Sequence, residues 1–473
     1  MSQKLCLFFP GYDSPEFVGF ARVRMRLIHK LQEYGVRVYS GGTVAPKNSI
    51  QISWGQPFDT KQDREVWDRK ENVSYSIGYT VFESDLMPNG WAESFIQHDA
   101  VWSASDFCCN VIRKELQEKN IDKKVYKIQH GVDSSYFMPM RRDFYRGTNR
   151  SSDPFTFLWV GMNPDDRKRG KDIERIFQQI KLPGMKLILK FAPLHNPKGQ
   201  FLEVSDSSHI SMFYKHHEMM AMLYNSDAFI YPSRCEGFGL QPLEFGATGL
   251  PCAATAYSGM MDYMYDAANV WSKNYDYFKR LLFENPGRFD NEDGLHSAMF
   301  YPLKDFKIVR SFYLDEEDRY KNFKKECEEK GIPMNKNYRD INYGEWDAKD
   351  AIVSDDEIAK AMIFLYENQY NMKLLTHEMA RYIHTEWTWD RAVTQLLNCL
   401  DDMGLLEDLE WETPLGFNPN TQFLKVGANT KKYPTKTKYI IHEEQTDESR
   451  ILTPEEVMGD KINEGIPERG FEV

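Results

Sequence analysis

Residues 231–251 read Tyr-Pro-Ser-Arg-Cys-Glu-Gly-Phe-Gly-Leu-Gln-Pro-Leu-Glu-Phe-Gly-Ala-Thr-Gly-Leu-Pro, and this stretch decides which fold we expect. The apolar run at residues 228–231 has the length of a buried strand. The loop that follows contains two glycines, and Pro242 suits the first turn of a helix, where an N–H would have no helical partner. Gly249 suits the C-terminal cap of the same helix. The stretch therefore predicts a strand, a glycine-rich loop and a helix, a unit from which parallel α/β sheets are built.

The predicted start of this helix has the features of an anion site. It leaves backbone N–H groups unpaired and carries the positive end of the helix dipole, so it favours a phosphate. Gly237 and Gly239 allow a ligand to approach the backbone closely. Glu236 precedes the helix and Glu244 lies within it. Two carboxylates would repel a phosphate, but each can accept hydrogen bonds from two sugar hydroxyls. The pattern indicates a ligand in which sugar and phosphate alternate, as in a nucleoside diphosphate sugar.

The alternation of strand and helix extends through the chain in two successive series. Short apolar runs flanked by turn residues are typical of parallel strands covered on both faces. The first series comprises residues 4–9, 36–40, 50–54, 73–77, 100–104 and 125–129, and the second comprises 155–160, 185–191, 209–213, 228–231 and 252–256. Helical spacing of apolar residues occurs at 19–34, 172–180, 217–224, 354–370 and 388–402. We therefore expect an α/β protein with two Rossmann-like, doubly wound domains that face a cleft.

Changes in composition predict the domain boundaries. The first domain is expected at residues 1–145 and the second at 146–385, joined by a stretch rich in Arg, Ser, Asp and Asn. Between about 270 and 343 the strand and helix rhythm is lost, which predicts an insertion. Residues 411–473 are polar and increasingly acidic, which predicts a C-terminal extension.

Composition narrows the class of protein. The chain has 473 residues, of which 41% are hydrophobic and 27% are charged, as in globular proteins with large cores. Its net charge of -12 disfavours DNA as a partner. No apolar run is long enough to cross a bilayer. The seven cysteines lack paired spacing, so we expect a reducing, cytoplasmic location and no zinc site.

The motif around the two glutamates resembles a known family. Glu236 and Glu244 match the E-x(7)-E motif of retaining GT-B glycosyltransferases, in particular glycosyltransferase family 4. Residues 225–233, 249–251 and 258–259 are similar to the strand and turns that surround the motif in that family. The resemblance covers residues 161–261 well and is weaker over the first half of the chain.

Two further segments are similar to the family. His130-Gly131-Val132-Asp133, followed by Phe137, resembles the segment before its interdomain linker. Residues 385–397 resemble its closing helix, and their tryptophans, Trp387 and Trp389, are expected to anchor the core. The resemblance therefore implies that residues 386–410 cross back to the first domain.

The resemblance also implies the roles of the motif residues. Glu244 would hold the ribose hydroxyls of the nucleotide, and Glu236 would contact hydroxyls of the transferred sugar. Donor binding would lie in the second domain and acceptor binding in the first. The loop backbone would face the diphosphate at Gly237, Phe238, Gly239 and Leu240.

Basic residues are expected near the leaving group, which gains negative charge as the glycosidic bond breaks. Arg167, Lys168 and Arg169 are the candidates. The family often has an arginine after the first glycine of this loop, where this chain has Met162. We favour Lys168 and Arg169, with Glu236, as catalytic residues and Arg167 as a donor-binding residue, although a run of charges can equally be a solvated surface.

Four residues are candidates for the acceptor side of the site: Gly19, Arg22, Glu83 and His130. Gly19 and Arg22 lie at the start of the first predicted helix, where the family has a glycine-rich turn. His130 can equally be a satisfied core histidine, and Glu83 can be a buried structural partner.

The mechanism that the resemblance implies is transfer with retention of anomeric configuration, in which a phosphate oxygen acts as the base. It requires no metal and no cofactor, since the nucleotide sugar is a co-substrate. The acceptor would be a saccharide, a lipid-linked sugar or a small molecule. One alternative is glycosylation of a modified DNA base, and another is a non-catalytic subunit that binds nucleotide sugars. No predicted strand precedes G-x-G-x-x-G, which disfavours a dinucleotide oxidoreductase.

Overall fold

The computed structural model describes residues 4–11, 19–55, 57, 61–139, 154–162, 167–180, 182–191, 200–204, 207–211, 216–264, 300–330 and 346–412. The predicted linker, most of the C-terminal extension, and residues 265–299 and 331–345 of the predicted insertion lie outside this range. Asp165 and Asp166 of the basic loop do so as well.

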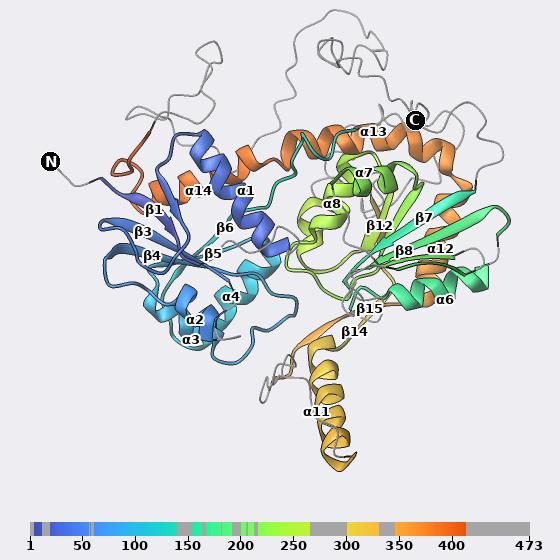
Figure 1. Cartoon of the computed structure of the whole chain (residues 1–473), viewed down its shortest axis with the longest axis horizontal. Helices are drawn as coiled ribbons and strands as arrows, with labels where there is room; N and C mark the ends of the chain where they lie inside the picture. The colour runs from blue at the N-terminus through green and yellow to red at the C-terminus, as the bar shows by residue number, and fades with distance from the viewer. Residues whose placement is uncertain are drawn as a thin grey trace, which may run out of the picture. The chain divides into compact units, whose positions relative to one another are not determined.

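The first domain is built on a six-stranded parallel sheet with the order β2-β1-β3-β4-β5-β6 (Figure 1). Its strands are β1 (Cys6–Phe9), β2 (Val38–Ser40), β3 (Ser49–Trp54), β4 (Val73–Tyr79), β5 (Ala100–Ser103) and β6 (Lys124–Lys127). β1, β3 and β5 are buried at every position, as expected for strands covered on both faces.

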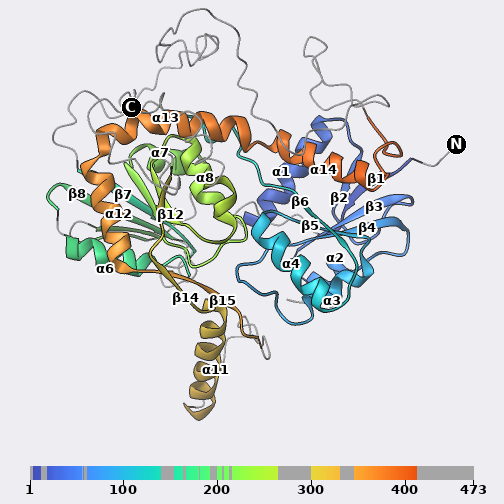
Figure 2. The same cartoon turned by 180° about the vertical axis from the view of Figure 1, so that it is seen from behind.

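Helices cover both faces of the first sheet. They are α1 (Gly19–Glu33), α2 (Lys61–Trp67), α3 (Trp91–Ser94) and α4 (Asp106–Glu118). α1 lies on one face and α2, α3 and α4 lie on the other (Figures 1 and 2). This arrangement follows from right-handed crossovers, because the chain leaves β1 toward β2 and leaves β3 in the opposite direction.

The second domain has a seven-stranded sheet with the order β13-β12-β11-β7-β8-β10-β9. Its strands are β7 (Phe155–Val160), β8 (Met185–Phe191), β9 (Gln200–Val204), β10 (Ser207–Ser211), β11 (Ala228–Tyr231), β12 (Cys252–Thr255) and β13 (Phe300–Leu303). The pairs are parallel except for β10 with the edge strand β9.

The helices of the second sheet also divide between its faces. α7 (His216–Tyr224) and α8 (Leu240–Ala247) lie on one face, and α6 (Gly170–Ile180) and α12 (Asp355–Glu367) lie on the other (Figures 1 and 2). The side chain of Ser354 caps α12 by accepting from the N–H of Glu357.

A two-stranded ribbon extends from the second domain. β14 (Phe306–Arg310) pairs antiparallel with β15 (Lys349–Val353), and α11 (Phe312–Lys330) follows β14 directly. α11 points away from the sheets (Figure 1). The base of the helix is anchored by an apolar cluster that contains Leu314, Trp346 and Ala348.

The last two described helices connect the domains. α13 (Gln369–Glu386) packs on α8, and α14 (Trp389–Asp402) packs on α1. Thr388 caps α14 by accepting from the N–H of Arg391. Beyond α14, a bridge joins Leu409 to Leu5 of the first domain. Trp387 and Trp389 are both buried at this junction.

The predicted fold class is confirmed, since the structure has two parallel, doubly wound sheets. β9 and α13 were not predicted, although the buried residues Met379, Tyr382 and Ile383 of α13 are spaced as on one face of a helix. β13 lies in the range predicted as an insertion, yet it pairs with β12 in the main sheet. None of the described helices combines the length and apolar composition that crossing a bilayer requires.

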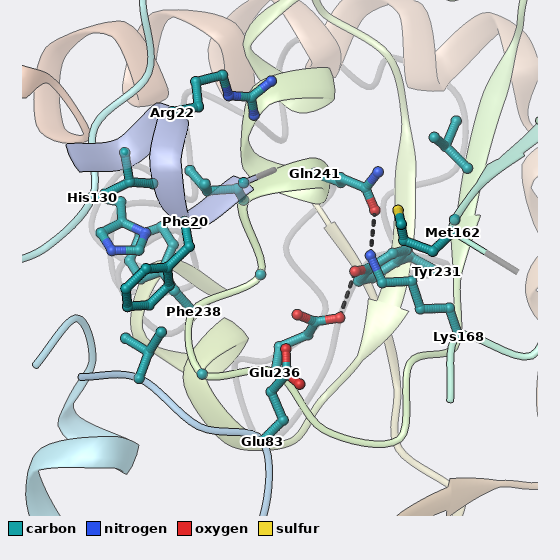
Figure 3. Close-up of a pocket in the computed structure, with 18 of the residues that line it drawn as sticks. Phe20, Arg22, Glu83, His130, Met162, Lys168, Tyr231, Glu236, Phe238 and Gln241 are labelled. Atoms are coloured by element: carbon teal, nitrogen blue, oxygen red, sulfur yellow. Dashed lines mark hydrogen bonds between the residues drawn. The ribbon is translucent and has the colours of Figure 1, made fainter. Parts of the chain in front are cut away.

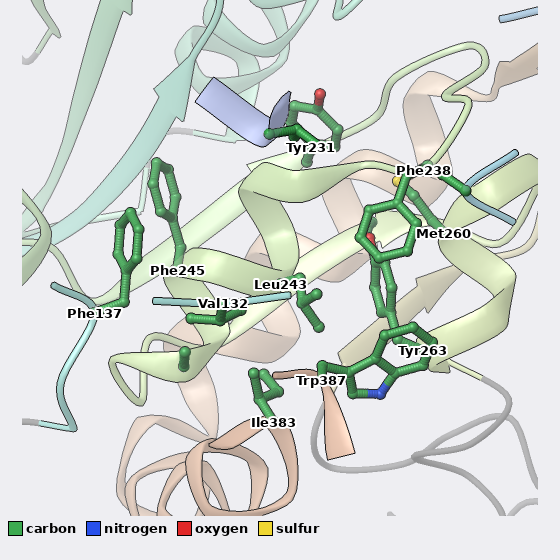
Figure 4. Packing of buried hydrophobic residues seen from close by; sticks show 14 of the residues in the cluster. Val132, Phe137, Tyr231, Phe238, Leu243, Phe245, Met260, Tyr263, Ile383 and Trp387 are labelled. Carbon is green, nitrogen blue, oxygen red and sulfur yellow. The ribbon is translucent and has the colours of Figure 1, made fainter. Parts of the chain in front are cut away.

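An apolar cluster fixes α8 beneath the candidate site. Leu243 on α8 lies near Ile383 and Trp387 at the end of α13, within the main apolar cluster (Figure 4). The two helices approach closely at Gly246, where an added Cβ would lie 2.9 Å from Ile383 Cδ1. The position of the start of α8 is therefore set by the core and not by the loop alone.

Candidate active site

A cavity of about 450 Å³ lies where the two domains meet (Figure 3). Its first-domain lining includes Gly19, Phe20, Arg22, Val81, Glu83 and His130. Its second-domain lining includes Met162, Arg167, Lys168, Lys190, Tyr231, Glu236, Gly237, Phe238, Gly239, Leu240 and Gln241. Its volume is in the range of small-molecule sites.

The topology of the second sheet explains the place of this cavity. From β7 the sheet continues to β8 on one side and to β11 on the other, so the connections leave in opposite directions. Such a switch point opens a crevice at the carboxyl ends of the strands. Lys168 follows β7 and Glu236 follows β11, which brings both to this crevice.

The glycine-rich loop is shaped by close contacts. Gly239 is the N-cap residue of α8 and has φ of 81°, a left-handed conformation that glycine adopts readily. At Gly237 an added Cβ would lie 2.9 Å from the carbonyl oxygen of Phe82 in the first domain. Ser105 Oγ donates to the carbonyl oxygen of Gly237 at 2.6 Å. The loop is therefore held against the first domain, with the start of α8 at the cavity.

Glu236 is held by hydroxyl groups of its own domain. Its Oε1 accepts hydrogen bonds from Tyr231 Oη at 2.5 Å and from Ser233 Oγ at 2.9 Å. Its backbone N–H donates to Ser258 Oγ at 2.9 Å. The side chain is 9% exposed and borders the cavity, so its position is fixed before any ligand binds.

Arg167 joins Glu236 to a carboxylate of the other domain. Its Nη1 lies 2.5 Å from Glu236 Oε1, and its Nη2 forms an ion pair with Glu83. Burial acts to raise the pKa of Glu236, but Arg167 and Lys168 outweigh it and lower that pKa to about 2. Burial raises the pKa of Glu83 in spite of the Arg167 charge. Glu236 is therefore a carboxylate at neutral pH.

Lys168 borders the cavity beside the start of α8. Its Nζ donates to Gln241 Oε1 at 3.0 Å and lies 5.2 Å from the centre of the Tyr231 ring (Figure 3). The cation–π contact with Tyr231 and the hydrogen bond to the side-chain amide of Gln241 both hold the Lys168 ammonium in place. Lys168 and Arg167 thus reach the same cavity as Glu236.

Arg169 does not reach the cavity. Its φ is +60°, and its guanidinium pairs with Asp172 at 2.7 Å and with Asp355 at 3.2 Å. It also donates to the carbonyl oxygen of Val353 at 2.5 Å. The left-handed backbone turns this side chain toward the start of α6 and α12, so of the three predicted basic residues only Arg167 and Lys168 border the cavity.

Glu244 lies beside the cavity and is paired across the domains. Arg22 Nη2 donates to its Oε1 at 2.7 Å and to its Oε2 at 2.8 Å. Arg22 borders the cavity, whereas Glu244 is behind it with a side chain that is 7% exposed. Burial raises the pKa of Glu244, and Arg22 opposes this rise.

The remaining acceptor-side candidates also border the cavity. Gly19 begins α1, and His130 lies 4.6 Å from Phe238 between ring centroids. His130 Nε2 is 2.5 Å from Tyr79 Oη, while its buried Nδ1 has no hydrogen-bond partner in the described part of the chain. Burial lowers the pKa of His130 to about 3, so the ring is neutral at pH 7.

Lys190 and Tyr313 are among the residues at the site that were not predicted. Lys190, at the end of β8, borders the cavity, and a lysine that ends a predicted buried strand was the available signal. Tyr313, on α11, donates a hydrogen bond to Glu83. It lies in the range predicted as an insertion, and no sequence signal placed it near the site.

One segment of the chain matches a known protein family. Residues 198–280 match the model of the family described as glycosyl transferases group 1. That segment contains the glycine-rich loop, Glu236 and Glu244. A search of curated proteins gives no match.

Three solved structures illustrate the likeness of fold. Sucrose-phosphate synthase from Thermosynechococcus elongatus is 12% identical with a TM-score of 0.44, and the match covers 75% of this chain and 73% of that one. WaaG, a glycosyltransferase involved in lipopolysaccharide biosynthesis, is 14% identical with a TM-score of 0.44, covering 82% and 97%. A glycosyltransferase from Rickettsia africae is 11% identical with a TM-score of 0.47, covering 85% and 99%.

The family match bears on the activity, because the matched segment supplies the loop and the helix that open onto the cavity. On this ground the chain is identified as a glycosyltransferase with two parallel-sheet domains.

Proposed function

We propose that this enzyme transfers a sugar from a nucleoside diphosphate sugar to a hydroxyl acceptor with retention of anomeric configuration. One observation carries the proposal: Glu236, Arg167, Lys168 and the start of α8 border a single cavity between the domains. Carboxylate, cations and helix N-terminus are the groups that a ligand with both sugar and phosphate requires.

The diphosphate would lie at the start of α8. Leu240 and Gln241 begin the helix at the cavity, and its N-terminal N–H groups and dipole favour negative charge. Lys168 is held beside them through Gln241. As the glycosidic bond breaks, the diphosphate gains negative charge, which these fixed groups stabilise without reorganisation.

The transferred sugar would lie against Glu236. Tyr231, Ser233 and Arg167 Nη1 engage its Oε1. Its Oε2 has only a 3.4 Å contact with Arg167 Nη2 among the hydrogen bonds of the described residues. A sugar hydroxyl can therefore donate to Oε2 without displacing the network that orients the carboxylate.

The ribose would approach Glu244, to which Arg22 already donates. Both oxygens of Glu244 accept from Arg22 in the structure. Because a carboxylate has about four acceptor positions, a ribose can share Glu244 with Arg22 or replace it. The side chain of Arg22 is 37% exposed, so its movement away from Glu244 would expose little additional buried surface.

The acceptor would enter from the first domain. Phe20, Val81 and Phe238 provide apolar surface, and Glu83 and His130 provide polar groups. The attacking oxygen would approach the same face of the sugar from which the phosphate leaves, and a phosphate oxygen would take its proton. Arg169 has no part in this proposal because it is held away from the cavity.

A panel of UDP-, GDP- and ADP-sugars tests the proposal. We expect one donor to raise the melting temperature, since a ligand that binds only the folded state stabilises it. With that donor, release of the nucleoside diphosphate should accelerate when a hydroxyl acceptor is added, and the product should keep the donor's anomeric configuration by NMR. A product with inverted anomeric configuration would contradict the retaining mechanism. Donor binding without any turnover would instead support a non-catalytic subunit.

A further inference from the structure

Lys190 is placed beside the basic loop by the pairing of two strands. Its Cα is paired with Val160 at the end of β7, and its carbonyl oxygen accepts from the N–H of Gly161 at 3.0 Å. Gly161 and Met162 begin the loop that leads to Lys168. All four of Gly161, Met162, Lys168 and Lys190 border the cavity.

The burial of Lys190 is unusual for its side chain. On the same face of β8, Lys186 and Ile188 are half-buried, whereas Lys190 is 7% exposed. Burial lowers the pKa of the Lys190 ammonium. Lys190 is therefore a buried basic side chain that borders the cavity.

The residue that follows Gly161 carries no charge. Met162 borders the cavity at the end of β7, beside the strand that carries Lys190. Met162 is 53% exposed and cannot attract a phosphate. The structure brings a cation to the same end of the sheet from the neighbouring strand.

Resting on the function proposed above, we propose that Lys190 binds the diphosphate of the donor and stabilises it as a leaving group. The bond between the anomeric carbon and the phosphate oxygen breaks, and its electron pair remains on that oxygen. The acceptor oxygen bonds to the anomeric carbon and its proton passes to the phosphate. Lys190 keeps its own proton and donates a hydrogen bond to the diphosphate.

Binding of nucleoside diphosphates and nucleosides separates this role from others. Wild type, Lys190→Met and Lys186→Met are titrated by calorimetry with UDP, GDP and ADP and with the matching nucleosides. Lys186→Met is the matched control, because Lys186 lies on the same strand but does not border the cavity. For the nucleotide that wild type binds, Lys190→Met should bind the diphosphate at least tenfold more weakly and the nucleoside unchanged. Lys186→Met should match wild type with both.

Moving the charge gives a second test. The double variant Met162→Arg/Lys190→Met places a cation on the adjacent strand, and it should recover at least part of the lost diphosphate affinity and turnover. If Lys190→Met does not fold by circular dichroism, Lys190→Arg provides the comparison. It should retain diphosphate affinity and a steep dependence of that affinity on salt concentration.

The outcomes distinguish the two proposals. If wild type binds no nucleoside diphosphate, the proposed function fails. If wild type binds one and folded Lys190→Met binds it equally well, only the role of Lys190 fails. An equal loss of diphosphate and nucleoside affinity would place Lys190 at the base or in the fold and would also overturn its role. Loss of diphosphate affinity in Lys190→Arg equal to that in Lys190→Met would overturn it as well.

Discussion

Arg22 on α1 and Glu244 on α8 form an ion pair that joins the two domains, with both carboxylate oxygens accepting from one guanidinium nitrogen. The two residues are 222 positions apart in the chain. Glu244 has the place that the motif gives to a ribose-binding acid, and Arg22 of the opposite domain donates to it. Under the function proposed above, donor binding and the contact between domains act on the same carboxylate.

Replacing Glu244 by Ala should weaken binding of the nucleoside diphosphate by about tenfold or more, the effect of losing hydrogen bonds to a charged group. Calorimetry with a nucleoside diphosphate and its 2′,3′-dideoxy analogue measures the effect. Wild type should prefer the ribose form, and Glu244→Ala should bind the two forms equally. A preference that persists in the variant would show that another residue holds the ribose.

Replacing Glu236 by Gln should lower kcat by about 100-fold, because the amide cannot accept from Tyr231, Ser233 and Arg167 as the carboxylate does. The KM for the donor should change by less than about threefold if Glu236 acts mainly in the transition state. Steady-state kinetics measures both constants. Glu218→Gln, an exposed acid on α7, is the control and should retain wild-type kinetics. An unchanged kcat in Glu236→Gln would show that Glu236 has no role in catalysis.

Replacing Tyr313 by Phe should change the pH profile of the enzyme. Tyr313 donates to Glu83 and favours its ionised form, so its loss should raise further a pKa that burial already raises. If ionised Glu83 supports activity, the acidic limb should move to higher pH by about one unit, the size of a charged hydrogen bond. Tyr366→Phe removes a hydroxyl that donates to Pro183, outside the cavity lining, and should leave the profile in place. Identical profiles for Tyr313→Phe and wild type would show that Glu83 does not control activity.

Asp262 should make the stability of the protein depend on pH. It lies between the domains, 3.2 Å from Lys127 Nζ, and it accepts from the N–H of Asp106 at 3.0 Å. Burial raises its pKa to about 6, although Lys127 opposes this rise. Between about pH 4 and 6 the folded chain holds a proton that an unfolded aspartate has released, so this residue adds stability as the pH falls.

Comparison of wild type with Asp262→Asn measures that contribution. From pH 7.5 to 4.5, the free energy of unfolding of wild type should rise relative to the variant by about 2 kcal/mol, as urea denaturation would report. A difference that stays constant over this range, or that changes in the opposite direction, would contradict the raised pKa of Asp262.

The sequence predicted the helix α8 correctly because its signals are local. Pro242, Gly239 and Gly249 mark the start and end of a short helix whatever surrounds them, and α8 runs from Leu240 to Ala247. The apolar runs likewise predicted most strands, because strands buried on both faces must be apolar. β9 and α13 contain no continuous apolar run, so this signal did not predict them.

The chain by itself determined two parallel sheets, a glycine-rich loop that opens α8, and two acids on either side of the helix start, since these follow from backbone preferences and apolar period. Only the tertiary structure decided which charges meet. It directs Arg167 and Lys168 to the cavity but holds Arg169 on Asp172 and Asp355, and it brings Lys190 and Tyr313 to the site from a neighbouring strand and a distant helix. The direction of a side chain depends on its backbone dihedral angles and on partners far away in the sequence. The neighbouring residues in the sequence determine neither of these.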